Sequence, residues 1–332
     1  MSTASADVRS GLLIIDKPQG ITSHDVVSRV RRLAHTRRVG HAGTLDPMAT
    51  GVLVIGINKA TRLLTWITDH TKRYEARVRL GVETTTEDAE GDLSAARGCT
   101  TFNLSEFENV LGGFRGQISQ VPSAVSAIKV DGKRAYARVR AGEEVVLKPR
   151  QVEISALDVA GEAYCHEASY FVDGQERLVP CVDIDISVEC SAGTYIRALA
   201  RDIGNALGCG AHLIALRRTR VGEFEIRNAH NLEFLIEAAE QTNGNAELPI
   251  TSLSEAARAM FPTVQLSDIE AAAFAHGQAP RRSKDEMKEF CAAVSATVTQ
   301  ELSGPFAALG DDGKVLGLLK ISDSRFKTIL VF

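Results

Sequence analysis

The sequence lacks any long uninterrupted apolar run, and no stretch approaches the roughly 18 consecutive apolar residues that a membrane-spanning helix needs. We therefore expect no transmembrane segment. Residues 1–10 are small and polar and have no apolar core of the kind that a signal peptide requires. They are interpreted as a frayed tail, and together these absences predict a cytoplasmic location.

Close cysteine pairs are also missing. The six cysteines are scattered and form no CxxC pair, which excludes a disulfide framework and argues against a zinc site with two close ligand pairs. Cys209 and His212 have a ligand-like spacing, but no second close pair accompanies them. The thiols are interpreted as small hydrophobic side chains, and no metal is expected.

An overall positive charge is absent, because the formal net charge is −4 at pH 7. The distribution is nevertheless uneven. Residues 27–41 carry five arginines and no acid, residues 129–150 carry seven basic residues against three acids, and Arg217, Arg218 and Arg220 form a third basic group. Five acids lie between Glu83 and Asp92. Because local fields decide where a polyanion binds, the basic segments favour an RNA or DNA partner, with ordinary solvated faces as the alternative.

The chain has enough apolar residues for a sizeable core. At 332 residues and 44% hydrophobic content it exceeds one average domain. Helical spacing marks residues 59–68, residues 195–207 and a helix capped by Ser23. Strand patterns mark residues 12–15, 52–57, 73–82, 117–121, 124–130, 152–160, 182–189 and 212–224. Many strands with few helices between them predict the α+β class, with a mixed, mostly antiparallel sheet and flanking helices.

The pattern changes near residues 243–245, where Asn, Gly and Asn follow one another. Residues 11–245 are therefore interpreted as the first domain and residues 250–332 as a second, small and β-rich one, with strands at 306–309, 315–321 and 326–332. Within the first domain, the Asp131-Gly132 turn and the basic residues after it predict a projecting arm at about residues 122–150.

One carboxylate, Asp46, lies in a tight bend that is flanked by Gly43 and Gly51 and follows a basic segment directly. Since Pro47 comes next, the spacing alone is typical of a helix N-cap. The enclosure by glycines and apolar residues favours a catalytic acid instead. A buried carboxylate needs a cation, and Arg197, in the first turn of the helix at 195–207, is the best candidate to keep Asp46 ionised as a nucleophile.

Other side chains have both a plain and a functional interpretation. Tyr74 begins the apolar face of the strand at 73–82 and is either core or a platform on which a base stacks. His41 can cap, bind a phosphate or fill the space left by an extruded base. Arg217 can be a charge at the rim of a site or a contact to the nucleic acid.

Together these residues resemble the TruB family of tRNA pseudouridine-55 synthases. The resemblance covers about residues 11–225 and implies the pseudouridine-synthase fold, while the residues beyond are similar to a PUA-like RNA-binding module. The motifs that carry it occur in the family's order: Lys17-Pro18-x-Gly20-x-Thr22-Ser23, Gly40-His41-x-Gly43-Thr44-Leu45-Asp46-Pro47-x-Ala49-Thr50-Gly51, Lys72-x-Tyr74, Leu80-Gly81, Thr84 to Gly91, Ser126-Ala127-Ile128-Lys129-x-x-Gly132, Gly193-Thr194-Tyr195-Ile196-Arg197 and Leu216-Arg217-Arg218.

The resemblance implies isomerisation of the T-loop uridine at tRNA position 55, with base flipping and without cofactor or metal. Asp46 would be the nucleophile in cleavage of the N-glycosidic bond, and the base would rejoin the ribose through C5, with the order of steps left open. Arg197 would hold Asp46, and Tyr74 would stack on the base and is a candidate for removing the C5 proton. The substrate-binding residues that the resemblance implies are His41, Tyr74, Tyr195, Leu216, Lys17, Lys129 and Arg217.

The partner implied is the T-arm of tRNA, bound by a monomer that needs no other protein. Two rival functions stay open. The first is an RNA-folding factor that binds tRNA without catalysis, against which the presence of Asp46, Tyr74 and Arg197 speaks. The second is a small-molecule enzyme that uses Asp46, which would leave the basic segments unexplained. The arm departs from the family pattern at residues 121–125, which bears on its RNA contacts and not on the chemistry.

Overall fold

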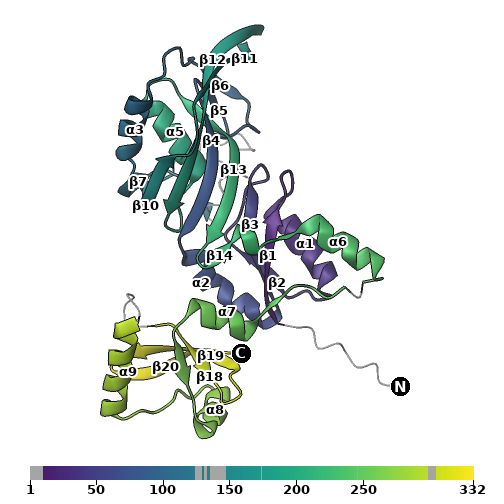
Figure 1. The fold of residues 1–332 in the computed structure, drawn as a ribbon, viewed down its shortest axis with the longest axis vertical. Coiled ribbons are helices and arrows are strands. Elements are labelled where there is room, and N and C mark those ends of the chain that lie inside the picture. The colour runs from purple at the N-terminus through teal and green to yellow at the C-terminus, as the bar shows by residue number, and fades with distance from the viewer. Residues whose placement is uncertain are drawn as a thin grey trace.

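The computed structural model describes residues 10–123, 129–130, 133–134, 147–172, 174–244, 246–297 and 304–332. A large curved sheet with its helices forms the upper and middle parts of the molecule, and a smaller C-terminal domain lies below them (Figure 1). None of the helices in the described part of the chain has the length and apolar character needed to cross a membrane.

The large sheet is mixed and mostly antiparallel, which confirms the predicted class. Its strands follow the spatial order β15-β1-β3-β13-β4-β12-β10-β7, with β2, β11, β14 and β16 paired at its margins. Among the named strands of this sheet, within the described residues, the parallel pairs are β1 with β15 and β3 with β13. The bounds are β1 Gly11–Lys17, β2 Val39–Ala42, β3 Thr50–Ile57, β4 Lys72–Leu80, β7 Gly116–Gln120, β10 Arg150–Val159, β11 Tyr164–Val172, β12 Gln175–Cys190, β13 Ala211–Val221, β14 Phe224–Glu225, β15 His230–Asn231 and β16 Thr251–Ser252.

Helices cover the two halves of this sheet. α1 (Ser23–Leu33) packs against β2 and α6 (Leu232–Gln241), and α6 packs against β1. α3 (Leu104–Gly112) packs against β10, and α5 (Ile196–Ala206) packs against β13 and β4 (Figure 1). The apolar faces of α1 and α5 are buried in one core with the strands of both halves. The short hairpin of β5 (Val82–Thr84) and β6 (Leu93–Ala96) adjoins β13, through a bridge between Asp88 and Leu213.

Two helices differ from the prediction, one in its N-cap residue and the other in being divided into two segments. α1 is capped by Thr22 rather than Ser23, because Thr22 and Asp25 form a reciprocal capping box. The Ser23 hydroxyl is buried and donates to the Leu45 carbonyl at 3.0 Å while accepting from the Leu45 N–H at 2.9 Å. The helix expected at residues 59–68 is divided into a 3₁₀ segment, η1 (Asn58–Leu63), and α2 (Leu64–Asp69).

The helix cap that the spacing of Asp46 and Pro47 would indicate by itself is absent: no helix follows Pro47, and the chain turns there and enters β3. Strand β11 was not predicted, because its residues alternate between exposed and half-buried positions rather than between polar and apolar ones. Its hairpin with β12 extends at the top of the molecule (Figure 1). Helices α3 and α6 were not predicted either.

Most of the arm expected at residues 122–150 lies outside the described residues. The same holds for residues 124–128 of the strand expected at 124–130 and for residues 1–9 of the expected tail. Two short strands are described in the arm, β8 (Lys129–Val130) and β9 (Lys133–Arg134), which pair antiparallel. The side chain of Lys129 is outside the described part.

The C-terminal domain contains the three predicted strands and one more. β17 (Thr263–Gln265), β18 (Phe306–Leu309), β19 (Val315–Ser322) and β20 (Arg325–Val331) form a sheet in that order. Helices α8 (Asp268–Ala275) and α9 (Lys284–Thr297), which the sequence did not reveal, pack on this sheet. α7 (Leu253–Met260) leads into the domain, and β16 just before it pairs with β1 of the large sheet.

Candidate active site

Asp46 stands at the start of a tight turn between β2 and β3. The Ala49 N–H donates to the Asp46 carbonyl at 3.1 Å, and the Gly20 N–H donates to the Pro47 carbonyl at 2.9 Å. Gly51 closes the segment with a φ of +103°, and a Cβ there would lie 2.2 Å from the Arg218 carbonyl oxygen. Only glycine fits that position, so the glycine in the motif is required by the path of the backbone.

Two buried cations hold this turn. The Lys17 ammonium donates to the carbonyls of Pro18 at 2.9 Å, Ile21 at 2.7 Å and Pro47 at 3.3 Å. Burial lowers the pKa of Lys17 to about 8. The structure thus places Lys17 underneath the turn and fully buried, not on a surface that a substrate can reach.

The second cation is Arg218, whose side chain is also buried. Its Nε donates to the Val52 carbonyl at 2.8 Å and its Nη2 to the Gly43 carbonyl at 2.9 Å. Arg218 therefore holds both ends of the turn. Arg218 was predicted as one of a basic group and as part of the Leu216-Arg217-Arg218 motif, without a role of its own. Its position within a predicted strand was the signal for a buried side chain.

Arg197 meets Asp46 as expected. Its Nε lies 2.9 Å from Asp46 Oδ2, and its Nη1 lies 3.3 Å from Asp88 Oδ2 and donates to the Thr86 carbonyl at 2.8 Å. The side chain of Arg197 is 7% exposed and that of Asp46 is 38% exposed. The carboxylate is thus half open, and the cation behind it is buried.

Asp88 is a site residue that sequence reasoning missed, because it was interpreted only as part of an acidic loop. Its side chain is buried and accepts from the Thr86 hydroxyl at 2.5 Å and from the Glu90 N–H at 3.0 Å. The signal available in the sequence was the position of Asp88 within the Thr84 to Gly91 motif. Asp88 fixes the guanidinium that in turn fixes Asp46.

A cleft of about 470 Å³ opens beside Asp46. Five of the predicted residues line it together with the end of α2, namely Asp46, Tyr74, Tyr195, Arg197 and Leu216. Tyr195 is fixed by Gln120, which accepts from its N–H at 2.9 Å and donates to its carbonyl at 3.0 Å. Burial raises the pKa of the Tyr74 phenol, so this group is protonated at neutral pH. The cleft has the size of a small-ligand site.

His41 and Arg217 are not among the residues that line this cleft. His41 lies on β2, edge-on to His24 with ring centroids 5.7 Å apart. Burial, aided by His24 and Arg218, lowers the pKa of His41 to about 4, so the ring is neutral at pH 7. Arg217 pairs with Asp16 at 2.7 Å and lines a second cavity of about 700 Å³, which Leu216 also lines.

The end of α1 and the loop that follows it present exposed positive charge. Arg31 and Arg32 at the end of α1 and Arg37 and Arg38 in the following loop are exposed. Among the described residues, no cluster of three His, Cys, Asp or Glu side chains is arranged to bind a metal ion. His212, which the sequence paired with Cys209, is buried with Nδ1 2.8 Å from the Val82 carbonyl.

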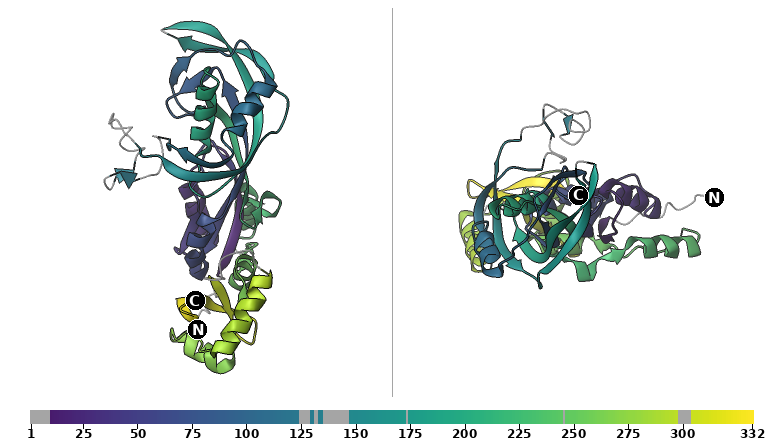
Figure 2. Two further views of the ribbon diagram at one scale, coloured as in Figure 1. Left: turned by 90° about the vertical axis from the view of Figure 1, so that its left-hand side faces the viewer. Right: turned by 90° about the horizontal axis from the view of Figure 1, so that it is seen from above.

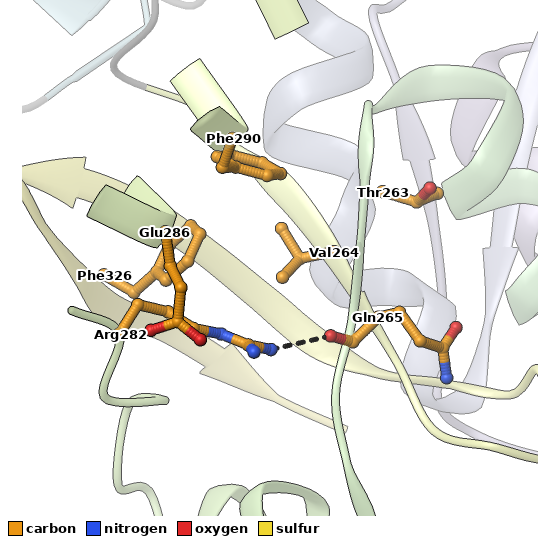
Figure 3. Close-up of a pocket in the computed structure, with 7 residues that line it drawn as sticks. All are labelled: Thr263, Val264, Gln265, Arg282, Glu286, Phe290 and Phe326. Atoms are coloured by element: carbon orange, nitrogen blue, oxygen red, sulfur yellow. Dashed lines mark hydrogen bonds between the residues drawn. The ribbon is translucent and has the colours of Figure 1, made fainter. Parts of the chain in front are cut away.

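A smaller cavity of about 260 Å³ lies in the C-terminal domain, between β17 and α9 (Figure 3). Val264, Phe290 and Phe326 form its apolar side. Arg282 donates to the Gln265 carbonyl at 3.0 Å and pairs with Glu270 at 2.9 Å. The cavity shares no lining residue with the Asp46 cleft.

Comparison with known proteins identifies the family. Residues 31–196 match the model of the TruB family pseudouridylate synthase N-terminal domain, and residues 197–260 match the tRNA pseudouridylate synthase B C-terminal domain. A tRNA pseudouridine synthase B of Arthrobacter sp. (strain FB24) is 48% identical over 97% of this chain and 96% of its own length. The protein of that name from Mycolicibacterium paratuberculosis is 45% identical over 97% of each chain.

Solved structures agree in fold. An H/ACA RNP bound to a substrate RNA containing 2′-deoxyuridine holds a chain with a TM-score of 0.67 and 22% identity, over 100% of this chain and 87% of that one. A chain of the archaeal box H/ACA sRNP Nop10–Cbf5 complex has a TM-score of 0.65 at 22% identity, over 99% of this chain and 88% of that one. With the sequence matches over nearly the whole length, these findings show that the chain belongs to the TruB family of pseudouridylate synthases.

Proposed function

We propose that this TruB-family tRNA pseudouridine synthase acts on the T-loop uridine at tRNA position 55, with Asp46 as its nucleophile. The observation that carries the proposal is the half-open Asp46 carboxylate, held by the buried Arg197 beside a cleft that accommodates one base. Relatives over nearly the full length carry the name tRNA pseudouridine synthase B. That the chain is an isomerase of tRNA uridine follows from its family.

The reaction is a rearrangement in which nothing is gained or lost overall. The uridine leaves its stack in the folded loop, at a cost of a few kcal/mol, and enters the cleft. The bond between N1 and ribose C1′ breaks, the base rotates, and a bond forms between C1′ and C5, after which the C5 proton departs and N1 is protonated. Asp46, paired with Arg197 at 2.9 Å, is the nucleophile in this cleavage, and the bond that it forms to the substrate breaks again before the product leaves.

The other residues have supporting roles in this proposal. Tyr74 stacks on the base and is the candidate for removing the C5 proton. Because its phenol is protonated, the phenol oxygen takes the C5 proton only as the phenol gives its own proton to water. Tyr195 and Leu216 form walls of the cleft. His41 is neutral and half-buried, so it fills the space that the base leaves in the T-loop without requiring a charged partner. Lys17 is reassigned from substrate binding to positioning of the turn, because its amine is bound to three carbonyls.

The tRNA backbone is bound by positive charge around the cleft, namely the arginines of residues 29–38, Arg217 and Lys129 of the arm. The C-terminal domain adds a PUA-like RNA-binding surface. The domain limits 11–245 and 250–332 with the arm at 122–150, the monomeric state, the cytoplasmic location and the absence of a cofactor belong to the same proposal.

The test uses an unmodified tRNA transcript labelled with tritium at C5 of its uridines. The wild-type protein should release tritium and leave pseudouridine at position 55, and Asp46→Asn should release none while binding the transcript with an unchanged Kd. Asp158→Asn, at an exposed acid far from the cleft, is the matched control and should turn over normally. Turnover by Asp46→Asn would exclude the nucleophile, and binding without turnover by the wild type would favour an RNA-folding factor.

A further inference from the structure

The two domains share one apolar core. Buried residues of β18, β19 and α7 in the C-terminal part lie in a single cluster with buried residues of β1, β3, η1 and α2 in the catalytic part. The members that meet there include Ala256, Ala257, Ala307, Leu309, Val315 and Leu318 from the former and Leu12, Ile14, Val52, Val54, Leu63 and Ile67 from the latter. The domains are therefore packed as one body and not merely tethered.

Helix α2 lies at this junction (Figure 1), and a view from the side also shows the C-terminal domain directly below the catalytic part (Figure 2, left). The ring of Trp66 meets that of Phe261 edge to face, with centroids 6.1 Å apart and planes at 85°. The guanidinium of Arg62, one turn earlier, donates to the Val331 carbonyl at the end of β20. The C-terminal domain thus contacts α2 through the aromatic pair, and it contacts the adjoining η1 through the hydrogen bond from Arg62.

The far end of the same helix forms a wall of the catalytic cleft. Thr68 and Asp69 line the cleft together with Asp46. The Lys72 ammonium donates to the Thr68 carbonyl at 2.8 Å and to the His70 carbonyl at 2.7 Å, and Lys72 itself is buried at the cleft. A cation at this end of a helix stabilises its unpaired carbonyls.

We propose that the C-terminal domain holds the catalytic cleft in its reactive shape through α2, with Lys72 as the positioning residue at the junction. A helix of six residues has no stability of its own, so packing decides its orientation. The C-terminal domain contacts one end and Lys72 binds the other. Lys72 also precedes Tyr74 by two residues on the same face of β4, so a shift of Lys72 moves the stacking ring as well.

The inference rests on the proposed function and adds a separable claim: the domain contact affects the rate of the chemical step. The simpler alternative is that Lys72 and the shared core contribute only to folding. The inference predicts that folded variants of the junction have a lower single-turnover rate at saturating tRNA. The folding-only alternative predicts that this rate is unchanged.

The first test compares Phe261→Ala with Phe290→Ala. Phe290 packs against Phe306 and Phe326 on the opposite side of the same sheet, so its loss weakens the domain without touching α2. Phe261→Ala should lower the single-turnover rate roughly 10- to 100-fold, the effect of a displacement of about 1 Å, with the tRNA Kd changed less than about twofold. Phe290→Ala should keep the wild-type rate.

Trp66 is the one tryptophan in the sequence, so intrinsic fluorescence reports directly on the junction. Its emission should shift in Phe261→Ala and in the milder Phe261→Leu, which keeps the fold if the alanine variant does not. A Phe261 variant with shifted emission and a wild-type rate would overturn the inference, and so would equal slowing by Phe290→Ala.

The second test compares Lys72→Met with Lys72→Arg. The methionine variant removes the donor and should reduce the rate at saturating tRNA at least about tenfold with little change in Kd, while the arginine variant should recover part of it. A Lys72→Met protein with a lower Tm and an unchanged rate would show a folding role only and contradict the inference. If the wild type made no pseudouridine at position 55, the proposed function itself would fail, and this inference with it.

Discussion

Arg197 joins Asp46 to Asp88: its Nε is 2.9 Å from the first carboxylate and its Nη1 is 3.3 Å from the second. One of these acids is open to the cleft and the other is buried. The guanidinium therefore cannot swing away with the substrate, because its other arm is held by Asp88 and by the Thr86 carbonyl. The exposed carboxylate is presented by a fixed cation rather than by a mobile one.

Asp88→Asn should slow catalysis although Asp88 does not line the cleft. The substitution weakens one anchor of Arg197 and lets Asp46 shift, for which we expect roughly a 10²-fold loss in the single-turnover rate with tRNA binding preserved. Tritium release from C5-labelled tRNA measures it. Asp92→Asn, an exposed acid of the same loop, is the control, and equal rates for the two variants would contradict the anchoring role.

Tyr74→Phe and Tyr74→Leu should separate stacking from proton transfer. The phenylalanine ring keeps the stack, so the tRNA Kd should hold while the release of the C5 proton slows by about 10²-fold, the size of a lost general-base contribution. Leucine also removes the stack and should cost roughly a further 1–3 kcal/mol. If Tyr74→Phe kept the wild-type rate, Tyr74 would have no role in proton transfer and would act only by stacking on the base.

His41 should make the stability of the fold depend on pH between about 4 and 6.5. Its pKa falls from 6.5 to about 4 on folding, so in this window the unfolded chain binds a proton that the folded chain does not. The free energy of unfolding must then rise with pH. His41→Gln should show a smaller rise than the wild type in urea titrations at pH 5 and pH 7. His276→Gln, at an exposed histidine that caps the end of α8 in the C-terminal domain, is the control. Parallel changes in wild type and His41→Gln would refute the assignment.

Binding of tRNA should depend on salt through the arginines before His41. Replacing Arg37 and Arg38 together by glutamine removes two exposed cations, so the slope of log K against log salt should become shallower by about 2. Filter binding at salt concentrations from about 50 to 300 mM measures this slope. Arg177→Gln, at the distant end of the β11–β12 hairpin, should leave the slope unchanged, and an unaltered slope in the double variant would remove these residues from the interface.

The sequence predicted well wherever one segment carries its own signal. The alternation of β4, the apolar faces of α1 and α5 and the buried run of β3 are local patterns, and each element lies within a few residues of its predicted limits. Prediction failed at β11, where neither face is fully buried, and at α2, where the structure divides one predicted helix. β11 is held by pairing with the next strand, β12, and α2 is held by a contact with Phe261 of the C-terminal domain; neither contact leaves a periodic pattern in the segment itself.

Asp46 illustrates the same limit within the site. Its spacing to Pro47 is that of a helix cap, yet the structure has a turn, because Lys17 and Arg218 bind the surrounding carbonyls from two other strands. Lys17 was predicted to bind the substrate, but it is buried. Asp88 was predicted only as one acid of an acidic loop, but it anchors Arg197. Charged side chains show no periodicity that says whether they point inward, so the sequence leaves their roles open.

The amino-acid sequence by itself determined the α+β class, the glycine-flanked bend with its single acid, and the ordered motifs of the family, because periodicity, turn chemistry and motif spacing are local properties of the chain. Only the tertiary structure decided that β13 lies between β3 and β4, that Arg197 therefore reaches Asp46, and that the C-terminal sheet packs against α2. The reason is physical: strand order and domain packing are fixed by burial of apolar faces far apart in sequence, and the ion pairs of the site form only after that burial has brought their partners together.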